Sequence, residues 1–103
     1  MKRLLSIALL LPFSVYAADY MLTIKNHQFQ PAELTVPSGT KIKLQIENKD
    51  DTPEEFDSYA LNREKLIAGN SSASIFIGPL TPGRYTFAGE FHAATAQGAI
   101  VAQ

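Results

Sequence analysis

The chain has 103 residues, with nine basic and ten acidic side chains, and it contains no cysteine. A chain of this length forms one domain, and its slightly negative charge disfavours nucleic acids and anionic membrane surfaces as partners. The lack of cysteine excludes disulfides, iron–sulfur clusters, cysteine zinc sites, thiol redox chemistry and cysteine nucleophiles.

The first residues have the pattern of a secretory signal peptide. Lys2 and Arg3 precede an apolar run from Leu4 to Phe13, and small or branched residues stand at the two positions that signal peptidase reads, the second being Ala17. This pattern predicts a signal peptide over residues 1–17, cleaved after Ala17. The apolar run is too short to serve as a membrane anchor. We therefore expect a periplasmic protein that is not itself embedded in the membrane.

Cleavage leaves one mature domain, residues 18–103. Its 86 residues carry seven basic side chains, because Lys2 and Arg3 are removed, against ten acidic ones. Alternation of apolar and polar side chains predicts that this domain consists of short strands. The alternation breaks over residues 26–31, and residues 61–66 are compatible with one helical turn or with an irregular crossover. Strands are expected over residues 19–25, 34–36, 41–47, 53–57, 72–77, 85–87 and 98–101.

The turn Leu80-Thr81-Pro82-Gly83-Arg84-Tyr85 has the spacing of a tyrosine corner, in which the phenol hydrogen-bonds back to the backbone at a Greek-key crossover. About seven short strands separated by regularly spaced turn signals are typical of a β-sandwich. The predicted fold class is therefore all-β, a Greek-key β-sandwich.

The most unusual stretch is Pro53-Glu54-Glu55-Phe56-Asp57, which places three carboxylates around one aromatic residue. Like charges this close raise one another's pKa, so a folded chain keeps them only if water, a partner or a cation neutralises them. We interpret the stretch as one half of a metal site, whose other half is Glu90-Phe91-His92. On a strand, Glu54 faces one side while Glu55 and Asp57 face the other, so all three acids bind one metal only if a bulge intervenes.

The mature chain resembles a cupredoxin over nearly its whole length. In the cupredoxin pattern, Glu54 stands where the first copper histidine is found, and Gly89 stands where the copper cysteine is found. His92 matches the second histidine, and Gln97 matches the weak axial ligand. Without a thiolate, a trigonal His-Cys-His copper centre cannot form.

A closer resemblance is to the EfeO-type cupredoxin-like domains of bacterial ferrous-iron uptake. It is carried by Glu-Phe-Asp-Ser at 55–58, by Arg63-Glu64-Lys65 and by Gly78-Pro79-Leu80-Thr81-Pro82-Gly83. This resemblance implies an iron and/or copper ion bound outside the cytoplasmic membrane. It also implies a partner, either an inner-membrane iron permease or another periplasmic uptake component.

Two arrangements of the metal site stay open. The cupredoxin pattern favours Glu54 facing the His92 loop, whereas the EfeO resemblance favours Glu55 with Asp57, joined by Glu64 as a second, outer site. Carboxylates with one imidazole suit Fe(III), Fe(II), Cu(II) or Mn(II) and bind Cu(I) poorly. The candidate metal ligands are Glu54, Glu55, Asp57, Glu64, Glu90 and His92.

Three functions are compatible with these residues. The first is a metal-binding accessory protein of ferrous-iron uptake, the second a copper-dependent ferroxidase acting on Fe(II), and the third a non-metal interaction domain that docks a membrane partner. The sequence leaves open whether the protein is an enzyme, and a hydrolase is disfavoured because no Ser/His/Asp set can be assembled from His27 or His92. We expect His27 to lie on the surface rather than to bind metal.

Overall fold

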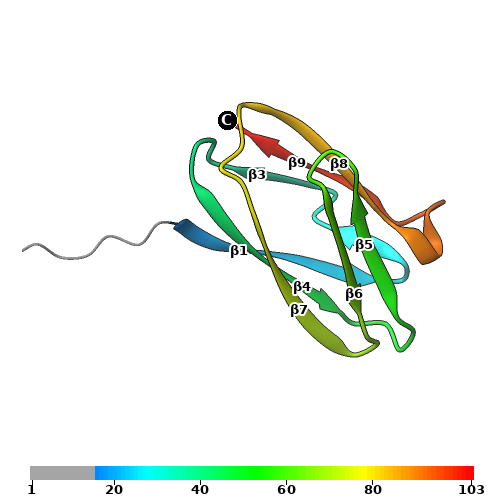
Figure 1. Ribbon diagram of the computed structural model, residues 1–103. Helices are drawn as coiled ribbons and strands as arrows, with labels where there is room; N and C mark the ends of the chain where they lie inside the picture. Colours follow the sequence, from blue (N-terminus) through cyan, green and yellow to red (C-terminus); the bar gives the residue numbers. More distant parts are fainter. Residues whose placement is uncertain (1–15) are drawn as a thin grey trace, which may run out of the picture.

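The computed structural model describes residues 16–103 of the chain, with side chains from residue 19 onward, as two β-sheets packed face to face (Figure 1). Most of the expected signal peptide, residues 1–15, lies outside the described residues. In the described part, no helix has the length and apolar character needed to cross a membrane. The elements are β1 (Tyr16–Lys25), β2 (Gln28–Gln30), β3 (Glu33–Val36), β4 (Lys41–Asn48), β5 (Glu54–Ser58), β6 (Arg63–Ile67), β7 (Ser71–Ile77), β8 (Gly83–Gly89), the short 3₁₀ helix η1 (Glu90–His92) and β9 (Gln97–Ala102).

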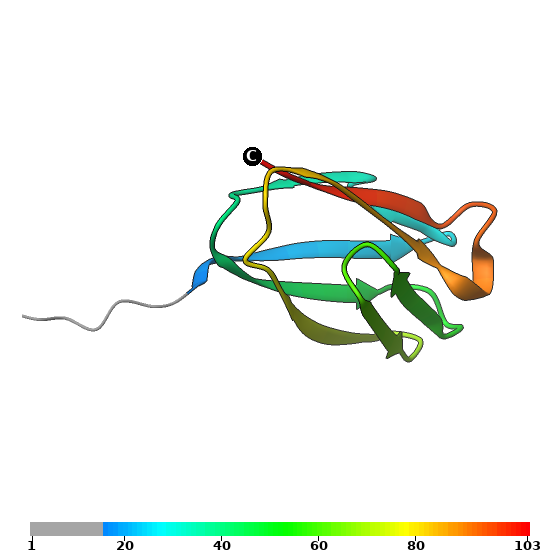
Figure 2. The ribbon, with the colours of Figure 1, turned by 45° about the horizontal axis from the view of Figure 1, so that its top comes forward.

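The two sheets have the strand orders β2-β1-β4-β7 and β3-β9-β8-β5-β6. Strands β1 and β4 are parallel, as are β3 and β9, and the other neighbours are antiparallel. The chain crosses repeatedly between the sheets, and η1 lies at the end of the sandwich away from the C-terminus (Figure 2). The predicted all-β two-sheet sandwich is confirmed.

Alternating burial places the core between the sheets. Along β4 every second residue is buried, and Ile42, Leu44 and Ile46 are fully buried against the second sheet. At the η1 end the core is aromatic, because Phe29 packs edge-to-face on Phe87 with ring centroids 4.9 Å apart. Burial of this apolar surface is the main source of stability for a chain without disulfides.

The tyrosine corner is confirmed. The Tyr85 hydroxyl donates a hydrogen bond to the Thr81 carbonyl at 2.7 Å, across the turn that leads into β8. This bond fixes the crossover from the first sheet to the second and therefore the start of the strand that ends beside η1.

Neither of the two alternatives for residues 61–66 is right, because this segment lies in and next to the edge strand β6. Asn62 adopts a left-handed φ of 56° and turns the chain back, so that β6 pairs antiparallel with β5. Within β6 only Ile67 is buried, which leaves no alternation for the sequence to show. The break expected at residues 26–31 contains the short strand β2, which follows a two-residue turn at Asn26 and His27.

Candidate metal centre

The three acidic side chains of strand β5 lie on two opposite faces of the strand. Its pairing with β6 runs from Glu54 to Ser58 without a bulge, so the alternation is uninterrupted. Glu54 points into the sandwich and is 1% exposed, while Glu55 and Asp57 are half-buried on the outer face. As expected from strand geometry, the three acids of this stretch do not meet at one point.

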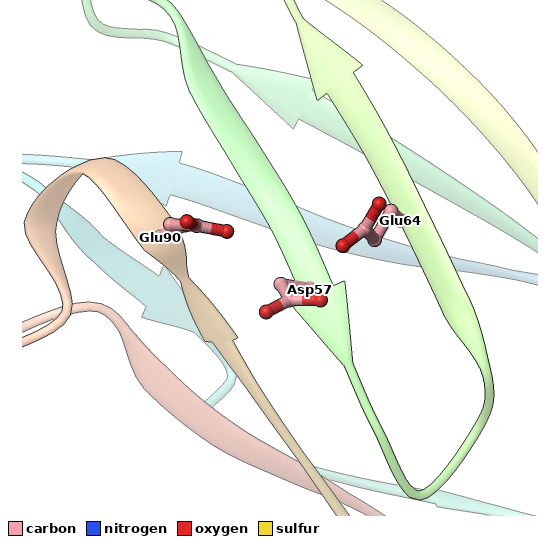
Figure 3. Close-up of side chains that lie close together, drawn as sticks. All are labelled: Asp57, Glu64 and Glu90. Carbon is pink, nitrogen blue, oxygen red and sulfur yellow. The ribbon is translucent and has the colours of Figure 1, made fainter.

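On the outer face, three carboxylates from three different elements come together. Asp57 on β5 is the direct cross-strand partner of Glu64 on β6, and Glu90 is the first residue of η1 (Figure 3). One oxygen atom from each of the three lies within 4.8 Å of the other two. Oxygen atoms at this separation are arranged so that one cation can be bound by all three.

Glu55 is the fourth acidic residue of this face. A hydrogen bond with Glu90 raises the pKa of Glu55 above its usual value of 4.5, and desolvation and the negative charges of Glu90, Glu64 and Asp57 raise it further. The charges of Glu90, Glu64 and Asp57 are therefore close enough to oppose the ionisation of Glu55. We call Glu55, Asp57, Glu64 and Glu90 the outer carboxylate cluster.

The outer carboxylate cluster borders a hollow of about 540 Å³, whose lining includes Asp57, Tyr59 and Glu64. Arg63 also lines this hollow, but its Nε donates to the Phe76 carbonyl at 3.0 Å and its Nη1 to the Asn62 carbonyl at 2.9 Å. These two guanidinium nitrogens thus bind backbone oxygen instead of the carboxylates. The hollow leaves solvent access for a hydrated cation at the cluster.

Inside the sandwich, Glu54 and His92 contact each other directly. The Glu54 Oε2 atom lies 2.7 Å from Nδ1 of His92, and Glu54 Oε1 accepts hydrogen bonds from the backbone N–H groups of Glu55 and Phe91, both at 2.9 Å. We call these two residues the inner pair. The acidic stretch and the loop at residues 90–92 therefore meet at one end of the sandwich, as the sequence predicted.

Gly89 makes room for the inner pair. A Cβ atom at this position would lie 2.6 Å from Cδ of Glu54 and 2.8 Å from Cβ of Ala96. Such distances are far below van der Waals contact, so a larger residue fits only if Glu54 moves. The Glu54 carboxylate thus fills the space that a side chain at position 89 would need.

His27 belongs to the same region, although we expected only a surface position for it. Its ring stacks on the His92 ring with centroids 3.5 Å apart and planes 8° from parallel. Its backbone N–H donates to Asp50 Oδ2 at 2.9 Å, and its carbonyl accepts a 2.6 Å hydrogen bond from the Thr95 hydroxyl. No sequence signal pointed to this contact, because it depends on the left-handed backbone at Asn26 and His27.

Asp50 fixes this turn from the loop that precedes β5. Its other carboxylate oxygen accepts the Asn26 N–H at 2.8 Å. Desolvation raises the pKa of Asp50, but the backbone hydrogen bonds from His27 and Asn26 and the charges of His27 and Lys25 outweigh this and hold the pKa below its usual value of 3.8. Asp50 is therefore a structural carboxylate rather than a further member of the outer carboxylate cluster.

The comparisons with known proteins point to one family. A family model of the cupredoxin-like domain matches residues 8–102. An uncharacterized protein of Rickettsia prowazekii (strain Madrid E) is 50% identical over 83 residues, which make up 81% of this chain and 66% of that protein. The chain thus spans slightly less than two thirds of the length of this relative.

Solved structures agree on the fold. Auracyanin A, a blue copper protein of Chloroflexus aurantiacus, superimposes with a TM-score of 0.72 at 15% identity, covering 84% of this chain and 98% of auracyanin A. The metal binding domain of a Cu(I)-exporting P-type ATPase from Streptococcus pneumoniae superimposes with a TM-score of 0.69 at 13% identity, covering 82% of this chain and 84% of that one. At such low identity the likeness is one of fold alone.

The residues of this chain do not fit a blue-copper centre. Gly89, which the sequence pattern matches to the copper cysteine, has no space for a side chain beside Glu54, and Nδ1 of His92 is bonded to Glu54. Gln97, which the same sequence pattern matches to the weak axial ligand, donates from Nε2 to the Ala93 carbonyl at 2.8 Å. A trigonal copper site needs a thiolate and two imidazoles, and this chain offers a carboxylate–imidazole pair there instead.

Proposed function

Because the chain belongs to the cupredoxin-like domain family and lacks the copper thiolate, we propose that it is a metal-binding protein whose ion is held by the outer carboxylate cluster. The observation that supports this most strongly is the approach of Asp57, Glu64 and Glu90 to within 4.8 Å of one another from three separate elements. Carboxylates placed directly opposite each other on paired strands destabilise a sheet, and a bound cation reverses that effect.

The ligand type narrows the choice of ion. An all-oxygen carboxylate set prefers hard or borderline cations such as Fe(III), Fe(II) and Mn(II), accepts Cu(II) and is poor for Cu(I). Glu64 and Glu90 are exposed and Asp57 is half-buried, so bound ion remains accessible to water and to a second protein. An accessible site suits a protein that receives an ion and passes it on, more than one that stores it.

The biological role we propose is that of an accessory protein in ferrous-iron uptake, of the EfeO type, acting in the periplasm. The support for this role is the resemblance of segments 55–58, 63–65 and 78–83 to such domains, together with the signal peptide expected at residues 1–17. In this role the partner is an inner-membrane iron permease or another periplasmic uptake component, which takes the ion from the exposed cluster.

Calorimetric titration tests the metal-binding proposal. We expect one equivalent of Mn(II), or of Fe(II) under anaerobic conditions, to bind the purified protein, and the double variant Asp57→Asn/Glu64→Gln to lose roughly tenfold or more in affinity. The matched control is Asp51→Asn/Glu47→Gln, which removes the same charges from positions outside the cluster. Equal affinity in the two double variants would refute the proposal.

A ferroxidase would differ from a carrier because it oxidises Fe(II) catalytically. We expect Fe(II) to disappear in air at the same rate with the wild-type protein and with Asp57→Asn/Glu64→Gln, whether or not Cu(II) is added. Copper-dependent turnover that is lost in the double variant would establish an enzyme in place of a carrier.

A further inference from the structure

We infer that Glu54 is a specificity-determining residue: it keeps His92 away from the bound ion, so that the metal meets oxygen ligands alone. This inference rests on the proposed function, because it concerns the ion held by the outer carboxylate cluster. Imidazole favours Cu(II) over Mn(II) and iron, so removing it from the ligand set shifts selectivity toward harder ions.

The hydrogen bond to Glu54 occupies Nδ1 of His92, so only Nε2 of the ring keeps a free lone pair. A carboxylate only accepts hydrogen bonds, so Nδ1 of His92 carries the proton in its 2.7 Å contact with Glu54 Oε2. Glu54 Oε1 is already bound by the backbone N–H groups of Glu55 and Phe91. Because Glu54 is only 1% exposed, these hydrogen bonds are shielded from competing water.

The remaining ring nitrogen of His92 is also badly placed to join the outer carboxylate cluster. In a 3₁₀ helix successive residues are roughly 120° apart, so Glu90 and His92 on η1 project in different directions. The His27 ring covers the face of the His92 ring at 3.5 Å. Turning His92 toward Glu90 therefore breaks both the stack and the bond to Glu54.

The stacked histidines do not form a second copper site of their own. Lone pairs of imidazole nitrogens lie in the ring plane, and the planes of His27 and His92 are only 8° from parallel. Lone pairs in two parallel planes do not converge on one ion. The stack thus presents imidazole rings as a packed unit rather than as a chelate.

Glu54 is the residue that holds the His92 ring in this orientation, because its carboxylate fills the space beside Gly89 and Ala96. Shortening the side chain removes the partner of Nδ1 and opens a space lined by His92. The ring is then free to turn, so that its nitrogen atoms reach a cation that enters from the exposed side of His92, whose side chain is 27% exposed.

Electron paramagnetic resonance with one equivalent of Cu(II) tests this inference, since coupling to imidazole nitrogen is visible in the spectrum. We expect no imidazole coupling in the wild-type protein or in Glu54→Gln, which fills the same space with an amide. We expect coupling to appear in Glu54→Ala and to vanish again in Glu54→Ala/His92→Gln.

Wild-type coupling that is lost in His92→Gln, or a folded Glu54→Ala without coupling, would overturn the inference while leaving metal binding intact. If Glu54→Ala does not fold, His92→Gln alone decides: we expect its Cu(II) affinity to stay within about twofold of wild type, and a loss of tenfold or more overturns the inference. If the wild-type protein binds no metal at all, the proposed function fails, and the inference that rests on it fails with it.

Discussion

Asp57 and Glu64 face each other directly across the antiparallel pair β5 and β6, so two like charges occupy adjacent positions on one sheet face. Such a pair destabilises a sheet. Glu90 from η1 adds a third carboxylate and Glu55 a fourth. The outer carboxylate cluster therefore lowers the stability of the metal-free fold, and a bound cation removes this effect.

The pH dependence of the stability of the metal-free protein should reveal this destabilisation. The raised pKa of Glu55 means that the folded state holds more protons than the unfolded state just above the usual value of 4.5. The contribution of Glu55 to stability is therefore present below that value and is lost as the pH rises through the folded-state pKa. Relative to Glu55→Gln, the wild-type protein should lose stability as the pH rises above the usual value of 4.5.

Urea midpoints measured at a series of pH values, in the presence of a chelator, give this comparison. Asp51→Asn is the control, because Asp51 is exposed and lies outside the outer carboxylate cluster. If the stability curves of wild type and Glu55→Gln run parallel across this pH range, the four carboxylates do not interact in solution.

The contribution of Asp50 to stability should depend on pH in the opposite direction. Its pKa is held below the usual value of 3.8, so its contribution is present above that value and is lost as the pH falls through the folded-state pKa. Asp50→Asn replaces one acceptor with an amide that repels the Asn26 or His27 N–H, at a cost of about 1 kcal/mol near pH 7. Urea unfolding should show that the variant and wild type converge in acid; a deficit that persists there would mean that the charge of Asp50 is not what holds the turn.

Any complex with Cu(II) should be pale. Intense visible absorption of cupredoxin copper requires a thiolate, and this chain has no cysteine and no room for a side chain at Gly89. Absorption spectra of the purified protein with one equivalent of Cu(II) check this. A strong blue band would contradict both the carboxylate assignment and the arrangement around Glu54.

Tyr85→Phe should destabilise the fold without changing metal affinity. The variant loses the hydrogen bond from the hydroxyl to the Thr81 carbonyl, worth about 1 kcal/mol, and neither residue belongs to the outer carboxylate cluster. Urea unfolding and calorimetric titration measure the two quantities separately. An unchanged urea midpoint would mean that the corner contributes nothing, and a large loss of affinity would mean that the crossover positions the metal ligands.

Much of the framework could be predicted from the sequence, because it follows from local patterns. The alternation in β4 and the spacing from Leu80 to Tyr85 are each contained in one short segment, and they suffice for the sandwich and the tyrosine corner. The opposite orientations of Glu54 and Glu55 follow from strand geometry alone.

The remaining features depend on contacts between distant segments. The edge strand β6 has one buried residue, Ile67, and so shows no periodicity. The meeting of Glu54 with the His92 loop is expected from the sequence, but their direct bond depends on the absence of a side chain at Gly89, and the stack on His27 depends on a turn held by Asp50. Such relationships arise from tertiary packing, which no single segment encodes.

The most direct test of the outer site is paramagnetic broadening of amide NMR signals by Mn(II) at a small fraction of an equivalent. A bound paramagnetic ion broadens the signals nearest to it. We predict selective loss of the signals of Asp57, Glu64 and Glu90 and their neighbours, while those of Asp50 and Asp51 persist. Broadening centred on the loop at residues 49–53, or uniform broadening over the acidic surface, would contradict a metal site at the outer carboxylate cluster.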